Sequence, residues 1–74
     1  MIEELERVIL TIDLPEQNLK QGDIGTVVLV HQAGQGYEVE FVTLDGETMA
    51  AVSLFANQLR PVGRREIAQA RVMA

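Results

Sequence analysis

The sequence predicts an all-β fold, a small and strongly curved barrel of five short strands. Three features indicate this fold: runs rich in β-branched residues, glycine-containing corners between the runs, and one Asp-Gly dipeptide placed to close a hairpin. A chain of 74 residues forms a single domain. We expect residues 1–62 to form the barrel and residues 63–74 to form a tail that is flexible or helical.

The first strand is expected at residues 7–13, "RVILTID", where β-branched side chains are frequent. Pro15 and Asn18 then mark a loop. The corner that follows places Gly22 and Gly25 directly before the next apolar run. Because glycine adopts positive φ and lets two backbone segments approach closely, both glycines are predicted to be structural turn positions.

The second strand is expected at residues 26–31, "TVVLVH", with apolar side chains on both faces. In an ideal strand Val28 and Val30 lie on one face, and Val27 and Leu29 lie on the other. A strand is buried on both faces where a small sheet curls over itself. We therefore predict burial of both faces over part of this run.

The clearest local signal is Asp45-Gly46, which follows the third expected strand, "YEVEFVTL" at residues 37–44. The dipeptide predicts a two-residue type I′ turn, in which partner residue numbers add to 91. One face of the hairpin is then a core of three pairs: Phe41–Ala50, Val39–Val52 and Tyr37–Leu54. The opposite face is mixed, and its pairs are Glu40–Ala51, Val42–Met49 and Leu44–Glu47.

The remaining elements are short. The segment "QAGQG", residues 32–36, is a loop between the second and third strands. One helical turn is expected at residues 55–58, "FANQ", and a last strand at residues 59–62, "LRPV". Pro61 has no backbone N–H to donate, which suits an edge strand.

The order of these elements resembles the SH3-like barrels, and three motifs are more specific: "LKQGDIGTVV", "YEVEFVTLDGET" and "QLRPV". Through these motifs, residues 5–62 resemble the small bacterial proteins of domain-of-unknown-function family 4926. The resemblance implies an SH3-like barrel and no established activity. The segment "GDIGTV" is also similar to the turn of the KOW element, which RNA-binding barrels surround with basic side chains. Here the turn carries Asp23 and a single lysine, Lys20.

Composition excludes several classes of protein. Without cysteine there is no disulfide framework, thiolate metal site or thiol nucleophile. The start, "MIEELERVIL", is acidic where a secretory signal carries positive charge, and no apolar run approaches the roughly 18–20 residues of a membrane span. We therefore expect a cytoplasmic protein without a membrane partner.

Charge is unevenly distributed along the chain. Residues 1–62 contain three basic and ten acidic side chains, a net charge of −7, whereas residues 63–74 contain three arginines and one glutamate, a net charge of +2. An acidic body repels phosphate backbones, whose binding rests on clustered Lys and Arg. Nucleic acid is therefore disfavoured as a partner.

Residues with catalytic chemistry are scarce. The single histidine, His31, ends a strand, and the only serine, Ser53, has no evident neighbouring base in the sequence, so no hydrolase triad is expected. Asp45 and Glu47 flank the hairpin glycine, but one short turn offers too few oxygens for a cation. We predict no catalytic residues, no metal and no cofactor.

The mixed face of the hairpin remains as a candidate surface. It combines apolar side chains with an acidic rim, an arrangement that often marks contact with another protein. A homodimer would also cover it, as would the N-terminal segment or the tail folding back. The candidate interface residues are Val42, Leu44, Met49 and Ala51, with Glu38 and Glu40 at the rim.

The tail beyond Gly63 contains helix-forming residues, with Ile67, Ala70 and Met73 at approximately helical spacing. A lone helix of about eleven residues is marginal in water. The tail is therefore expected to be disordered, or ordered by docking onto a partner.

These observations favour a non-catalytic protein-interaction module. A concrete form is a small acidic protein that neutralises the product of a neighbouring gene, as antitoxins and immunity proteins do. Two alternatives stay open: an accessory subunit of a larger enzyme complex, and a KOW-like RNA-binding domain.

Overall fold

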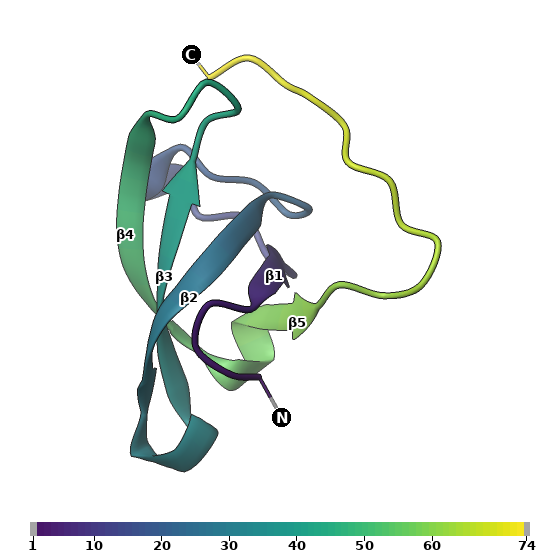
Figure 1. Ribbon diagram of the computed structural model, residues 1–74. Helices are drawn as coiled ribbons and strands as arrows, with labels where there is room; N and C mark the ends of the chain where they lie inside the picture. The colour runs from purple at the N-terminus through teal and green to yellow at the C-terminus, as the bar shows by residue number, and fades with distance from the viewer. Residues whose placement is uncertain (1, 74) are drawn as a thin grey trace.

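The computed structural model describes residues 2–73 and consists of one antiparallel sheet of five strands (Figure 1). The strands are β1 (Arg7–Leu10), β2 (Ile24–His31), β3 (Gly36–Val42), β4 (Thr48–Phe55) and β5 (Leu59–Pro61), in the spatial order β4-β3-β2-β1-β5. Three single 3₁₀ turns complete the fold: η1 (Pro15–Gln17), η2 (Gln32–Gly34) and η3 (Ala56–Gln58). The predicted all-β class is confirmed, together with the helical turn before the last strand.

Strand boundaries differ slightly from those expected. β1 ends at Leu10 rather than at Asp13: the N–H of Thr11 still donates to the carbonyl of Gln58 at 3.0 Å, in register with the β1–β5 pairs, but Gln58 belongs to η3 and not to a strand. β5 ends at Pro61, where the missing N–H cannot continue a ladder. β5 lies at one edge of the sheet, as the proline predicts.

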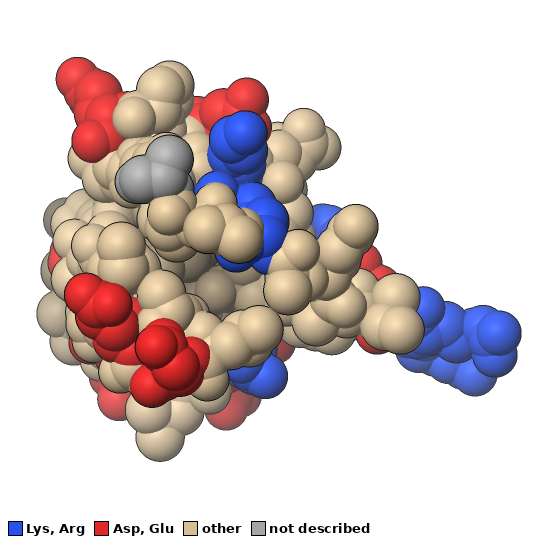
Figure 2. Space-filling model, turned by 90° about the horizontal axis from the view of Figure 1, so that it is seen from above, with Lys and Arg blue, Asp and Glu red and all other residues tan. Residues whose placement is uncertain are grey.

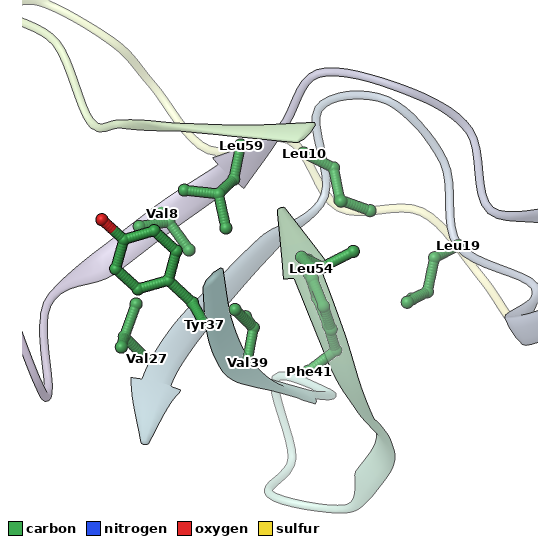
Figure 3. Close-up of a cluster of buried hydrophobic side chains, with 9 residues drawn as sticks. All are labelled: Val8, Leu10, Leu19, Val27, Tyr37, Val39, Phe41, Leu54 and Leu59. Atoms are coloured by element: carbon green, nitrogen blue, oxygen red, sulfur yellow. The ribbon is translucent and has the colours of Figure 1, made fainter. Parts of the chain in front are cut away.

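The core lies inside the curve of the sheet and takes one or more side chains from every strand (Figure 3). β3 shows the reason most clearly, since its alternate residues are buried while those between them are partly exposed. Leu19, from the loop before β2, closes the core beside Phe41 and Leu54 (Figure 3). The buried cluster comprises Val8, Leu10, Leu19, Val27, Tyr37, Val39, Phe41, Leu54 and Leu59.

The apolar run of β2 is explained by a β-bulge rather than by burial of both faces. Val27 pairs with Val39, but Leu29 pairs with Glu38, so Val28 is an extra residue without a partner. Val28 and Leu29 are 43% and 45% exposed, whereas Val27 is fully buried. The expectation of two buried faces is therefore wrong, because the bulge shifts the alternation of the strand.

Gly25 lies where β2 crosses the core. A Cβ at this position would lie 2.5 Å from Cγ1 of Val39 and 2.9 Å from Cε1 of Phe41. Both distances are shorter than carbon–carbon contact allows. Gly25 is therefore required for close approach, as the sequence predicts, and the groups it approaches are core side chains of β3.

Gly22 serves the turn that precedes β2. The carbonyl of Lys20 accepts a hydrogen bond from the N–H of Asp23 at 2.9 Å, and Gly22 between them has φ +96°. Positive φ at the third position of a β-turn favours glycine. The predicted turn role of Gly22 thus has a conformational cause.

The β3–β4 hairpin has the predicted register over most of its length. The pairs Phe41–Ala50, Val39–Val52, Tyr37–Leu54 and Glu40–Ala51 are all present. The register shifts after Phe41, however, and Val42 pairs with Thr48 instead of Met49. Met49 is consequently the extra residue of a bulge, and the predicted Val42–Met49 pair is wrong.

The turn also differs from the type I′ prediction. Gly46 has φ +96° and donates to the carbonyl of Thr43 at 2.9 Å, while Thr43 donates to the carbonyl of Glu47 at 2.8 Å. Asp45 is not among the positive-φ residues, although a type I′ turn needs positive φ at both central positions. The connection is a three-residue loop, Leu44 to Gly46, which removes the predicted Leu44–Glu47 pair.

The tail is extended. From Gly63 it arcs away from the sheet, and its last described residues return to the β3–β4 hairpin (Figure 1). No helix forms in residues 63–73, so the helical alternative is not what the structure shows. Ile67 and Val72 are each 93% exposed, so these two side chains are not packed against the sheet, and a short helix without such packing is marginal in water.

Candidate functional site

An apolar groove opens between the β3–β4 hairpin, the start of β2 and the end of the tail. Its volume is about 600 Å³. Val42, Leu44 and Met49, three of the predicted interface residues, line it together. The core side chains Leu19 and Phe41 form part of its wall. Figure 2 looks down on this end of the molecule, which is hollowed and has both basic and acidic side chains around the hollow.

The hairpin turn presents Leu44 to solvent. The hydroxyl of Thr43 accepts a hydrogen bond from the N–H of Glu47 at 2.9 Å and lies 2.5 Å from a carboxylate oxygen of Asp45. These bonds hold the three-residue loop closed. Leu44, at its tip, is 88% exposed. The predicted turn residues Asp45 and Gly46 therefore shape the rim of the groove, and Asp45 also lines it.

The bulge at Met49 explains how this side chain comes to share the groove with Leu19 and Phe41. An inserted residue bends the strand and increases its local twist. Met49 is 39% exposed and Val42 is 43% exposed, so both are partly covered. The grouping of these two side chains with Leu44 is as expected, although the pairing that brings them together is not.

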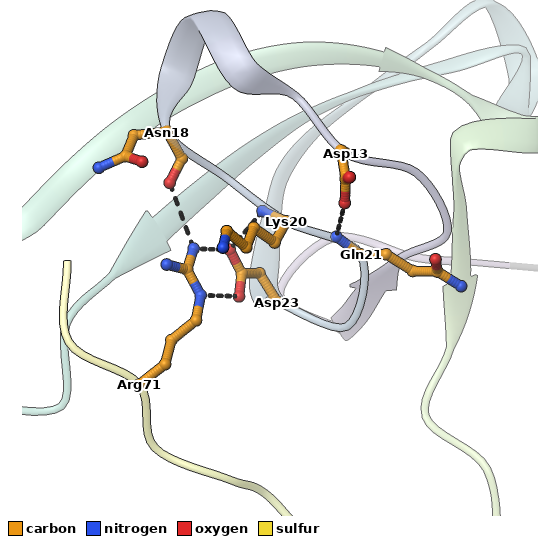
Figure 4. Close-up of polar contacts among 6 residues, drawn as sticks. All are labelled: Asp13, Asn18, Lys20, Gln21, Asp23 and Arg71. Carbon is orange, nitrogen blue, oxygen red and sulfur yellow. Dashed lines mark hydrogen bonds and ion pairs between the residues drawn. The ribbon is translucent and has the colours of Figure 1, made fainter. Parts of the chain in front are cut away.

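The end of the tail forms the opposite wall of the groove. Ala70 and Met73 line it, and Met73 also packs against the core. Arg71 holds this segment in place: its guanidinium donates from Nε to Asp23 Oδ1 at 2.9 Å, from Nη2 to Asp23 Oδ2, and from Nη2 to the carbonyl of Asn18 at 3.2 Å (Figure 4). Beside the groove, the tail is thus joined to the turn before β2 by an ion pair.

The turn before β2 orients the carboxylate of Asp23 for its contact with Arg71. Its carboxylate accepts the N–H of Lys20 at 2.8 Å, and Asp13 similarly accepts the N–H of Gln21 at 2.8 Å (Figure 4). Partial burial raises the pKa of Asp23, but the hydrogen bonds from Arg71 and Lys20 outweigh it, and the pKa is lowered overall. The carboxylate therefore stays ionised, and the cation that it binds in this structure is Arg71.

The other predicted interface residues lie elsewhere on the sheet. Glu40 and Ala51 pair with each other on the outer face. Glu38 lies nearer the opposite end, where its Oε2 is 2.9 Å from Nε2 of His31 and accepts a hydrogen bond from the hydroxyl of Ser53. The structure therefore divides the six predicted residues among the groove, the Glu40–Ala51 pair and a separate polar cluster at Glu38.

This polar cluster borders a second hollow of about 420 Å³, which Phe55 also lines. The hydrogen bond from Ser53, followed by that from His31, lowers the pKa of Glu38. A hydrolase triad places histidine between serine and carboxylate, whereas here the carboxylate lies between the other two. The hydroxyl of Ser53 thus donates to the ionised carboxylate of Glu38 and not to histidine, which is not the order of a hydrolase triad.

Sequence reasoning missed the contact between Glu38 and Ser53. A signal for it was present, since these two residues also satisfy the predicted hairpin register and are paired in the structure. Within residues 2–73 no group of three or more His, Cys, Asp or Glu side chains is placed to hold a metal ion. The same part of the chain contains no helix long and apolar enough to cross a membrane.

A second ion pair braces the start of the tail. The guanidinium of Arg60 donates to both carboxylate oxygens of Glu66, at 2.9 and 2.6 Å, and the N–H of Gly63 donates to the same carboxylate. The hydrogen bonds from Arg60 and Gly63 lower the pKa of Glu66 to about 2. Arg64 and Arg65, between Gly63 and Glu66, are exposed.

The fold and the groove together define a small antiparallel β domain with an apolar groove beside an ionised carboxylate. By sequence the chain belongs to the family described as a domain of unknown function, DUF4926, which matches residues 4–61. This match confirms the predicted family, begins just before β1 and ends with β5, leaving the tail outside it. Neither the curated proteins nor the solved structures include a match to the chain.

Proposed function

We propose that this protein is a non-catalytic protein-interaction module and that the groove beside the β3–β4 hairpin is its binding site. The observation that carries the proposal is the exposure of Leu44 beside Val42 and Met49, at the mouth of a groove that reaches core side chains. Apolar side chains gathered in a concave site release water when a partner covers them. Contact with another protein gives them that cover.

The charges around the groove define the kind of partner. Asp23 and Asp45 line it together with Arg7 and Arg71, and Asp23 is paired with Arg71, so the acidic groups that a partner meets are Asp45 and the neighbouring Glu47 of the hairpin turn. An acidic turn beside an apolar centre suits a protein that offers an apolar anchor next to a Lys or Arg. It does not suit a phosphate backbone, which would be repelled.

The contacts of the tail support this choice of partner. Arg71 pairs with Asp23, and Met73, two residues further on, packs against the core. A partner segment with a basic residue two positions before an apolar one would make equivalent contacts. On this proposal the partner either displaces the end of the tail or binds beside it.

The small size and acidity of the chain support a specific version of this role. A net charge of −5 favours rapid association with a basic partner. The protein would then neutralise the product of a neighbouring gene by covering its basic surface, as antitoxins and immunity proteins do. This role is more specific than that of an interaction module. Capture of an acidic partner would contradict the neutralising role but not the interaction module.

The proposal is tested with two substitutions and one matched control. Val42→Asp and Leu44→Asp place an unpaired charge at the groove, which should weaken partner binding by roughly 2–5 kcal/mol. Val28→Asp is the control, because Val28 and Val42 are the same residue type and are both 43% exposed. All three variants should remain folded by circular dichroism.

The readout is quantitative affinity capture of partners from the native cells, followed by measurement of binding to the purified partner. The proposal predicts that one protein is captured by the parent and by Val28→Asp, and that Val42→Asp and Leu44→Asp no longer capture it. Equal capture by all folded variants would contradict it. Capture of RNA in place of protein would favour the KOW-like alternative, and capture of a large enzyme would identify the accessory-subunit role.

A further inference from the structure

The two edges of the sheet differ in how they are protected. β5 has only three residues, and two of them are Arg60 and Pro61, which block pairing with another strand. β4 at the opposite edge has eight residues, and there is no charged side chain from Thr48 to Gln58. A long, uncharged edge strand is a template for pairing with a further strand. In Figure 1 it lies on the side of the molecule away from the tail.

The hydrogen bonds around β4 show which of its backbone groups are open. Ala56 donates its N–H to the carbonyl of Gln35, just before β3, at 3.3 Å. Phe55 instead donates to the side chain of Gln58 at 2.7 Å. Because N–H groups alternate in direction along a strand, those of Ala51 and Ser53 point away from β3. Both residues are exposed.

We propose that β4 pairs antiparallel with β4 of a second copy of this chain, about a twofold axis at Val52. In this register Ala51 of each copy lies opposite Ser53 of the other. Each such pair exchanges two N–H to carbonyl hydrogen bonds. All the open groups of Ala51 and Ser53 in both copies are thereby satisfied. The proposal concerns the edge of the sheet and does not depend on a partner in the groove.

The side chains favour a second copy as the occupant. In the same register Phe55, which is 71% exposed, lies two residues beyond Ser53 at each end of the paired segment, where a second copy would cover part of its apolar surface. Ala51 and Ser53 are small enough to pass one another without a clash. One strand thus supplies both halves of a self-complementary interface, as a twofold dimer requires.

The acidic character of the protein does not oppose this pairing. Glu40 is opposite Ala51 in the neighbouring strand, and Glu38 is opposite Ser53. In the dimer, three interstrand spacings of about 4.8 Å each separate Glu40 from Glu38 of the other copy. That separation, about 14 Å, exceeds the screening length of about 8 Å at physiological ionic strength.

The first measurement is amide hydrogen exchange of the full chain, resolved by residue, at concentrations from about 10 μM to about 1 mM, where a small interface dissociates. Exchange at Ala51 and Ser53 should slow by about tenfold or more as concentration rises, because these amides become bonded only in the dimer. Ala50 and Val52, which face β3, should not change. Concentration-independent exchange at Ala51 and Ser53 would overturn the proposal.

The second measurement is sedimentation equilibrium of the parent and three variants. Ala51→Pro removes an N–H that β3 does not use, and Phe55→Lys places a charge at each end of the paired strands. Either variant should weaken dimerisation by about tenfold or more. Leu29→Lys, on the exposed face of β2, is the control and should dimerise like the parent.

The sedimentation results either support or overturn pairing through β4. A monomeric parent at all concentrations overturns the proposal, as does a folded Ala51→Pro variant that dimerises like the parent. If Ala51→Pro fails to fold, Phe55→Lys decides in its place. Loss of the dimer in Leu29→Lys to the same extent would assign the interface to the outer face of the sheet and would also overturn pairing through β4.

Discussion

At the scale of single residues, two glycines allow the chain to bend sharply and pass close to its own core. Gly22 adopts a positive φ in the turn before β2. Gly25 has no unusual conformation, but a Cβ there would collide with Val39 and Phe41. The glycines thus act for different reasons, one conformational and one steric, and only the second makes the core sensitive to a single added carbon.

Gly25→Ala should destabilise the protein by about 1–3 kcal/mol, because the core must shift to admit one methyl group. The measurement is urea unfolding of the variant and the parent. Gly36→Ala is a matched control in the same sheet, since a Cβ there would meet its nearest neighbour, the carbonyl oxygen of Leu54, at an ordinary 3.5 Å. Equal free energies of unfolding for Gly25→Ala and the parent would show that the close approach is not required.

At the scale of elements, the strands and the register of the hairpin core could be predicted from alternation and turn chemistry. The two bulges could not. Val28 lies between Val27 and Leu29, and Met49 is followed by Ala50 and Ala51, so more than one apolar residue is available for the same place at each bulge. The extra residue is selected by tertiary packing, and therefore the groove that depends on Met49 was only partly predictable.

The course of the tail was harder to predict from the sequence than the two bulges. Its spacing fits a helix, but its observed course depends on two ion pairs between residues distant in sequence or separated by a turn: Arg71 with Asp23, and Arg60 with Glu66. Local propensity contains no information about such partners. The tail is therefore extended, with the Arg60–Glu66 ion pair near its start and the Arg71–Asp23 ion pair near its end.

Acid should release the tail from these anchors. The folded-state pKa of Glu66 is about 2 against an ordinary value of 4.5, and that of Asp23 is also lowered. A lowered folded-state pKa means that the contact contributes fully above the ordinary value and is lost as pH falls through the folded value. We expect carboxyl NMR to show Glu66 titrating near 2 and amide exchange in residues 64–73 to rise in the same range.

Arg60→Gln provides the control for this titration. Without the guanidinium, the pKa of Glu66 should return toward 4.5, while Asp23 should still titrate below its ordinary value because Arg71 is intact. Titration of Glu66 near 4.5 in the parent would contradict the bidentate pair and the braced path of the tail.

At the scale of the whole molecule, the charge distribution separates a protein partner from a nucleic acid. The chain carries a net charge of −5, and the basic groups of the anchors, Arg60 and Arg71, are already paired with carboxylates. Few counterions are available for release by phosphate contacts. The turn similar to a KOW element is part of this arrangement, since Asp23 within it holds Arg71.

The parent should therefore show no appreciable binding to duplex DNA or single-stranded RNA at physiological salt. Gel-shift or fluorescence anisotropy titrations provide the measurement. Micromolar or tighter binding that is abolished by Lys20→Glu would overturn this expectation. Binding that persists in Lys20→Glu but is lost in Arg64→Glu would assign weak affinity to the tail instead.

The central claim is that the groove beside the β3–β4 hairpin is the surface through which this protein binds another. Residue-resolved hydrogen exchange of the full chain, with and without the partner purified from its native cells, tests it most directly. We expect the partner to slow exchange in residues 42–49 and around Asp23, with the loop 32–35 at the opposite end of the sheet unchanged. Protection confined to that loop or to Arg64 and Arg65, with residues 42–49 unchanged, would contradict the claim.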